Sequence, residues 1–90
     1  PLVEQKNKNA RVKIKLTLAN RDLSSSNFSG LNLKGSSFDN CILSNANFAY
    51  CDLRNTHWQQ MTMLGINFTH CQFQQTVFQQ ITFTQCNLST

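Results

Sequence analysis

The chain has 90 residues, which is enough for one small domain and too few for a separate catalytic lobe. Apolar residues make up 40% of it and charged residues 13%, which argues against a charge-driven disordered chain. No run of about 18 apolar residues exists, so we expect neither a membrane-spanning helix nor a signal-peptide core.

The formal net charge of +4 comes from the start of the chain. Residues 1–15 hold five Lys and Arg residues against Glu4, whereas residues 16–90 hold three charges of each sign. We interpret residues 1–15 as a basic leader or N-terminal cap. A solvated tail is the simpler interpretation, and weak, salt-dependent attachment to nucleic acid is the alternative.

A period of five residues runs from Leu18 to Leu88. Every fifth position in this range is large and apolar, which at 40% apolar content has a chance of roughly one in a million. The position two before each is small or apolar, with Arg21 as the exception, and the following pair is rich in Gly, Asn and Ser. The fifteen central positions are Leu18, Leu23, Phe28, Leu33, Phe38, Leu43, Phe48, Leu53, Trp58, Met63, Phe68, Phe73, Phe78, Phe83 and Leu88.

Each unit therefore consists of an inward, an outward and an inward residue, followed by two turn-like residues. Three alternating residues form a minimal strand, and the pair that follows them suits a bend. A strict period of five matches neither a helix, with its period of about 3.6, nor a flat sheet. We therefore predict a coil that turns a corner every five residues and pairs its backbone with the coils above and below.

The sequence resembles the pentapeptide-repeat family from about Leu16 to Thr90, in stretches such as SNFSG, ANFAY, CDLRN and CNLST. The resemblance implies an all-β fold, a right-handed quadrilateral β-helix with about twenty residues per coil. On this basis residues 16–90 form just under four coils, and we expect them to be a fragment that continues beyond residue 90. Larger residues at the small inward position, such as Met61 and Ile81, are expected to distort individual coils.

Residues twenty apart should lie above one another, which sorts the apolar positions into inward columns that we assign to the core. Their aromatic members are Phe28, Phe38, Phe48, Trp58, Phe68, Phe73, Phe78 and Phe83. One outward column contains asparagine alone, and we expect its side-chain amides to hydrogen-bond to one another along the stack. This column consists of Asn27, Asn47, Asn67 and Asn87.

Two further outward columns do not fit a structural ladder. Tyr50 and His70 fall in one column above Gly30, and Lys34 and Arg54 fall in another. Tyr and Arg are favoured at interface hot spots. Tyr50, His70, Lys34 and Arg54 are therefore our candidate partner contacts.

The four cysteines have no metal-ligand spacing, since multiples of five residues separate them and each occupies the small inward position. We interpret Cys41, Cys51, Cys71 and Cys86 as core thiols in a reducing compartment, with a Cys51–Cys71 disulfide as the alternative. The sequence also contains no nucleophile elbow or glycine loop, and its three aspartates are expected on different faces. We predict a non-enzymatic segment that binds no cofactor and no metal.

The expected function is a non-catalytic scaffold for protein–protein interaction, because stacked coils give a rigid wall with independently variable outward residues. The Phe-rich and Gln-rich array resembles modules of larger bacterial proteins, including secreted effectors, which implies the bacterial cytoplasm or the cytosol of a host cell. The alternative that the resemblance implies is inhibition or protection of DNA gyrase, a topoisomerase. Members with that activity mimic the DNA duplex with an acidic surface, which this sequence lacks.

The far end of the coil offers an exposed strand edge without a charged segment to cover it. We therefore expect either further residues beyond Thr90 or self-association through this end. The expected partner is a protein, and neither a membrane nor nucleic acid is expected as the principal partner.

Overall fold

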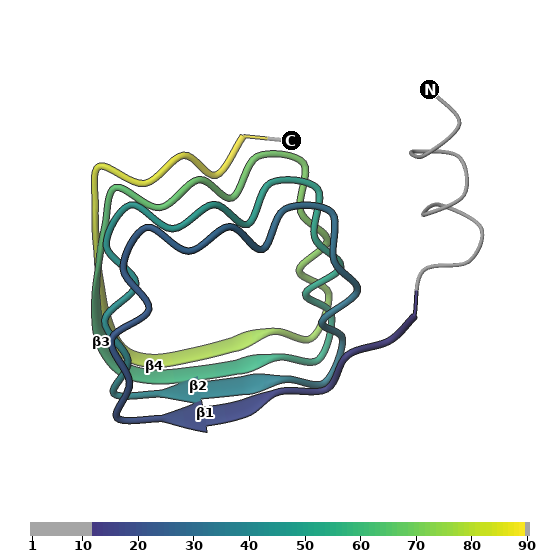
Figure 1. Cartoon of the computed structure of the whole chain (residues 1–90), viewed down its shortest axis with the longest axis horizontal. Coiled ribbons are helices and arrows are strands. Elements are labelled where there is room, and N and C mark those ends of the chain that lie inside the picture. Colours follow the sequence, from purple (N-terminus) through teal and green to yellow (C-terminus); the bar gives the residue numbers. More distant parts are fainter. Residues whose placement is uncertain (1–11, 90) are drawn as a thin grey trace.

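The computed structural model describes residues 12–89. Its strands are β1 (Thr17–Ala19), β2 (Ser37–Asp39), β3 (His57–Leu64) and β4 (Val77–Thr84), and no helix occurs among the described residues. The strands form one parallel sheet in the order β1-β2-β3-β4 (Figure 1). Within these strands, each paired residue lies beside the residue twenty positions further on, so that Leu18 lies beside Phe38 and Trp58 beside Phe78.

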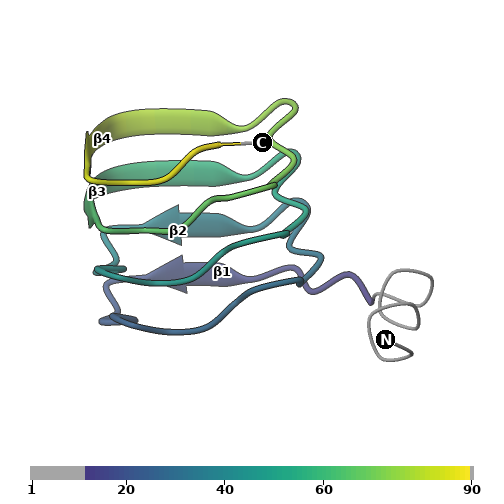
Figure 2. The same ribbon diagram turned by 90° about the horizontal axis from the view of Figure 1, so that it is seen from above.

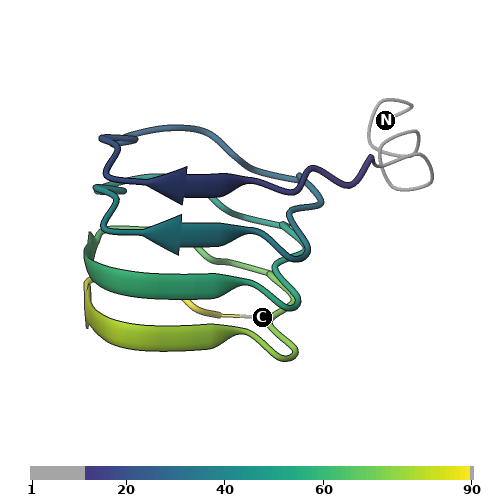
Figure 3. The ribbon, with the colours of Figure 1, turned by 90° about the horizontal axis from the view of Figure 1, so that it is seen from below.

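The chain winds as a right-handed coil with four sides. In Figure 1 it runs clockwise while receding from β1 in front to β4 behind, and Figures 2 and 3 show the coils stacked one on another. The other sides keep the twenty-residue register through isolated bridges, such as Asn27 with Asn47 and Asn32 with Asp52. The predicted all-β quadrilateral β-helix of just under four coils is confirmed.

We name each side after a buried residue at its centre, in chain order the Trp58, Met63, Phe68 and Leu53 sides. Strands β1 and β2 lie on the Trp58 side, whereas β3 and β4 continue round the corner onto the Met63 side. At this corner Met61 and Ile81 occupy the small inward position and remain paired with each other. The larger side chains accompany longer strands, and the coils that carry them keep the twenty-residue register although we expected them to be distorted.

Each corner from Asn20 to Gln85 contains a residue with positive φ. From Asn20 to Gln85 the backbone is left-handed at every fifth residue, with φ between 53° and 82°. Gly occupies three of these fourteen positions and Asn four, as expected for residues that adopt this conformation readily. At seven corners an amide NH donates to the carbonyl three residues earlier, as Cys51 does to Phe48 at 3.1 Å.

The interior is filled by the apolar columns. Rings on adjacent coils stack face to face, with centroids 4.3 Å apart for Phe38 and Trp58 and 4.7 Å apart for Phe28 and Phe48. Such stacking adds to the free energy gained by burying the rings. The residues exposed by at most 1% include Leu33, Phe38, Leu43, Phe48, Leu53, Trp58, Met63 and Phe68.

The predicted aromatic core is least complete at the two ends of the stack. Phe28, Phe73 and Phe78 are partly buried against the core. Phe83 departs from the prediction, because 40% of it is exposed although its ring packs on Phe78 with centroids 5.1 Å apart. Phe83 lies in the last described coil, where its inward column has no further neighbour among the described residues.

Polar residues at the small inward position bind backbone carbonyls. The thiols of Cys51, Cys71 and Cys86 each donate to a carbonyl 23 residues earlier, as from Cys71 Sγ to Phe48 O at 2.8 Å. Thr76 Oγ1 donates in the same way to Leu53 O at 2.6 Å. All four cysteines are reduced thiols, so the core interpretation holds for them and the disulfide alternative does not.

The asparagine column is held by local turns. Asn47 Oδ1 accepts the amide NH of Ala49 at 2.9 Å, and the same bond recurs two residues after Asn27, Asn67 and Asn87. This corrects the predicted amide-to-amide ladder, because each side-chain carbonyl binds its own backbone in an Asx turn. A side-chain bond between coils does occur at a corner, from Asn40 Nδ2 to Asn20 Oδ1 at 2.8 Å.

The first described residues lie along the first coil, and the chain between them and their partners on that coil is one residue shorter than between later coils. Ile14 donates its amide NH to Asn32 O at 2.8 Å, and Ser36 Oγ donates to Ile14 O at 3.2 Å. Lys13 pairs with Asn32, a separation of nineteen residues in place of twenty. The corner before β1 is therefore one residue shorter. Residues 1–11 of the predicted basic leader lie outside the described residues.

Candidate interaction surface

The predicted contact residues lie on one side of the coil. Tyr50 and His70 stand at the corner where the Leu53 side begins, and Lys34 and Arg54 stand at the corner where it ends. Both sequence columns therefore border the same face. This face consists of residues 30–34, 50–54 and 70–74.

Tyr50 and His70 form a stacked pair. Their ring centroids are 4.8 Å apart and their planes differ by 17°. Both residues occupy left-handed corners of adjacent coils, with φ of 62° and 59°. Their side chains therefore leave the coil in the same direction. Tyr50 is 61% exposed, so its ring is accessible to a protein surface.

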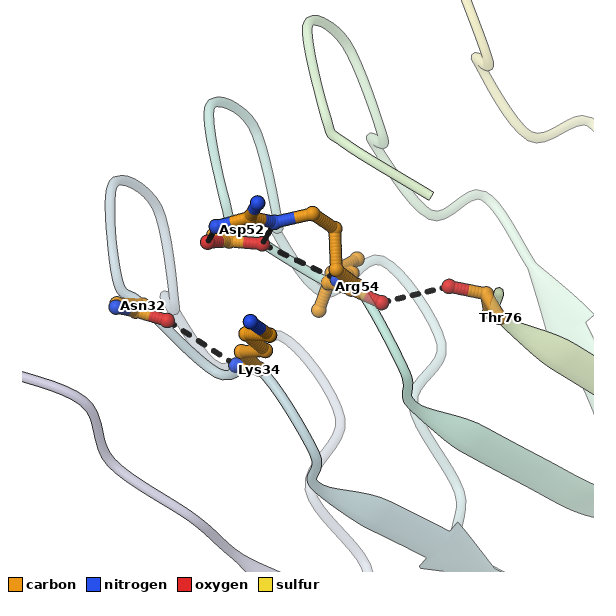
Figure 4. Close-up of polar contacts among 6 residues, drawn as sticks. Asn32, Lys34, Asp52, Arg54 and Thr76 are labelled. Carbon is orange, nitrogen blue, oxygen red and sulfur yellow. Dashed lines mark hydrogen bonds and ion pairs between the residues drawn. The ribbon is translucent and has the colours of Figure 1, made fainter. Parts of the chain in front are cut away.

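Arg54 is bound within the chain by Asp52. Its Nε donates to Asp52 Oδ1 at 2.9 Å and its Nη2 donates to Oδ2 at 2.7 Å, which gives a two-pronged ion pair (Figure 4). The Asp52 side chain is only 7% exposed, whereas the Arg54 side chain is 41% exposed. Asp52 occupies an outward position, as predicted, but the guanidinium covers it. The sequence reasoning did not pair these two residues, although they lie two apart on either side of a turn.

The ion pair fixes the charge of this corner. The hydrogen bond from the Arg54 side chain lowers the pKa of the Asp52 carboxyl, against the opposing effect of burial, and the charges of Arg54 and Lys34 lower it further. The pKa of Arg54 is raised by the same hydrogen bond. Because a lowered carboxyl pKa favours the ionised form, Asp52 stays a carboxylate at neutral pH, and its stabilising effect is lost only on acidification.

The hydrogen bond that positions Lys34 is made by its backbone amide and not by its side chain. Its amide NH donates to Asn32 Oδ1 at 3.2 Å (Figure 4), which is the same Asx turn as that between Asp52 and the amide NH of Arg54. The two cations therefore occupy equivalent positions on successive coils. A short Asn or Asp two residues earlier sets this geometry and was the sequence signal for it.

The cysteines and histidines do not form a metal centre in the described part of the chain, where no group of three metal-ligating side chains comes together. Cys71 is buried, and burial raises the pKa of its thiol to about 11. A thiol with this pKa is protonated and weakly nucleophilic at neutral pH. The burial of Cys71 therefore supports a role in packing the core.

The model of the pentapeptide repeat region matches residues 15–90 of the sequence, and the chain therefore belongs to the pentapeptide-repeat family. This match agrees with the four-sided coil and its five-residue corners. It supports a non-catalytic repeat scaffold. No curated protein matches the chain.

Across residues 12–89, no helix is long and apolar enough to span a membrane.

Proposed function

We propose that the chain is a scaffold for protein–protein interaction and that its partner contacts the Leu53 side. The observation that carries this proposal is the position of Tyr50, His70, Lys34 and Arg54, which border one rigid face. A stacked ring pair stands at one edge of this face, and two cations stand at the other. Aromatic and arginine side chains on a preorganised surface are the usual centres of binding energy in protein interfaces.

We further propose that the scaffold is a module of a larger bacterial protein, such as a secreted effector, and acts in a reducing cytosol. Four reduced cysteines are compatible with such a compartment. A gyrase-directed role is the alternative. It draws no support from the surface charge, because residues 12–89 carry five cations against three acids, whereas a duplex mimic needs an acidic surface.

The test is affinity capture with the folded chain from bacterial and animal-cell lysates, followed by mass spectrometry. The Tyr50→Ala variant is expected to lose the captured protein. Its melting temperature should change no more than that of the control variant. Gln60→Ala is the matched control, because it also replaces an exposed residue at a left-handed corner, but on another edge of the coil. Phe48→Asp serves as the misfolded chain.

Equal capture by the Tyr50→Ala and Gln60→Ala variants would reject the Leu53 side as the contact face. Retention of gyrase subunits would move the proposal to the topoisomerase alternative. Capture of host proteins from animal-cell lysate, lost in Tyr50→Ala, would support the effector scaffold.

A further inference from the structure

Four of the five described cations gather at the corner between the Leu53 and Trp58 sides. We call this group, Lys13, Lys15, Lys34 and Arg54, the basic ridge. The side-chain Cε atoms of Lys15 and Lys13 lie 3.9 and 4.0 Å from the position that a Cβ on Gly35 would take, directly beside Lys34. The fifth cation, Arg21, follows a different corner and precedes Asp22. The fold thus joins the start of the chain to two later coils in one charged surface.

Among residues 12–89, one carboxylate lies beside the basic ridge, that of Asp52. Asp52 is 7% exposed and is covered by Arg54, whose outer surface is 41% exposed. Four cations and this one carboxylate leave three net positive charges. Lys13, Lys15 and Lys34 form no ion pair with another described residue, and all three side chains are at least partly exposed. The ridge can therefore bind anions.

We propose that the basic ridge binds an acidic peptide segment of the protein partner, an inference that rests on the proposed scaffold function. Successive coils are about 4.8 Å apart, so the ridge spans only about 10 to 15 Å. This length suits a few carboxylates of an extended peptide, in which same-facing side chains are about 6.6 Å apart. Lysine ammoniums on flexible stems can adjust to that difference in spacing.

Nucleic acid fits the ridge less well. Proteins that bind single strands combine a basic groove with exposed aromatic rings on which bases stack. No Phe, Trp or Tyr lies among residues 30–35 or 51–55, and the exposed ring of Tyr50 stands at the opposite edge of the Leu53 side, where it stacks on His70. A duplex would require phosphate contacts over a longer surface than this ridge provides.

The experiment measures binding of the full 90-residue chain to a fluorescein-labelled oligoglutamate peptide by fluorescence anisotropy at low salt. Lys34→Gln and Lys15→Gln are each expected to weaken binding about threefold or more. Arg21→Gln removes the same charge elsewhere and is expected to change the Kd by less than about twofold. Asp52→Asn keeps the side-chain acceptor for the Arg54 amide and removes the negative charge, so it should strengthen binding.

Circular dichroism and the melting temperature establish that each variant is folded. Equal losses in Lys34→Gln and Arg21→Gln would overturn the proposal, because they would indicate attraction by net charge alone. Tighter binding of an oligothymidylate with the same number of charges would assign the ridge to nucleic acid. Absence of binding to the peptide would also reject the proposal. In either case capture that depends on Tyr50 would leave the scaffold function standing.

Discussion

At the scale of single residues, the left-handed corners differ in whether they require glycine. Gly30 and Gly65 both have positive φ, at 76° and 68°. A Cβ on Gly30 would meet nothing within 4 Å, whereas a Cβ on Gly65 would overlap Oδ1 of Asn45 on the preceding coil. Any residue with a Cβ adds backbone strain at both corners, but only at Gly65 must a neighbouring side chain also move.

Gly30→Ala is expected to lower the free energy of unfolding by about 1 kcal/mol, from backbone strain alone. Gly65→Ala should lower it by about 2 kcal/mol or more, because the Asn45 side chain must also be displaced. Urea denaturation of the two variants measures the difference. Equal losses of free energy in the two variants would show that the contact with Asn45 contributes nothing to the requirement for glycine at position 65.

Burial also governs cysteine chemistry at this scale. The pKa of Cys71 is raised by burial to about 11, whereas Cys86 is less buried. Because the thiolate is the reacting species, iodoacetamide near pH 8 should label Cys86 well before Cys71 in the folded chain. Mass spectrometry of labelled peptides follows both rates. A Cys86→Ser variant should leave only slow labelling of the buried thiols, and labelling of Cys71 as fast as that of Cys86 would contradict this expectation.

At the scale of elements, the side of a coil is a short extended segment closed by an Asx turn. Asn47 Oδ1 accepts the Ala49 amide NH at 2.9 Å, and Asp52 does the same for Arg54 at 3.2 Å. Asn47→Ala should therefore cost about 1 kcal/mol, the usual contribution of such a hydrogen bond, while Asn47→Asp keeps the acceptor. Gln72→Ala is the control, at the equivalent outward position of the Leu53 side, and should be nearly neutral. Chemical denaturation decides between these outcomes, and a neutral Asn47→Ala would rule out a stabilising turn.

The five-residue period predicted the coil because inward positions, outward positions and corners differ in residue type at every repeat. The same pattern placed Tyr50 above Gly30 and Lys34 beside Arg54, which was sufficient to find the candidate surface. It could not pair Asp52 with Arg54, since the period specifies which way a side chain points and not which neighbour it binds. It also could not place Lys13 and Lys15 on the basic ridge, because the shorter first corner breaks the period there.

At the scale of the whole molecule, each coil is stabilised by the coils on either side of it. Phe48 packs between Phe28 and Phe68 and is fully buried, whereas Phe83 lies in the last described coil and is 40% exposed. Phe48→Ala should therefore cost about 3 to 5 kcal/mol, and Phe83→Ala about 1 to 2 kcal/mol. Thermal and chemical unfolding measure both losses. Similar losses at the two positions would mean that stability is not graded along the stack.

The distribution of charge along the stack leads to a prediction about association. Residues 55–90 contain no Lys, Arg, Asp or Glu, and β4 pairs with β3 alone in the described sheet. Proteins commonly place charges on such edges to prevent pairing between molecules, and β4 has instead an uncharged sequence rich in β-branched and aromatic residues.

We expect the 90-residue chain to self-associate through β4 as its concentration rises. Thr82→Lys places a charge on this edge and should reduce association, because two such charges would face each other in a paired edge. Thr62→Lys is the control, since Thr62 lies in register with Thr82 on β3, one coil away from the edge. Sedimentation velocity over a range of concentrations measures the effect. A monomer mass for the unmodified chain at every concentration would contradict pairing through β4, and equal effects of the two lysines would indicate that the added charge acts on solubility and not on the edge.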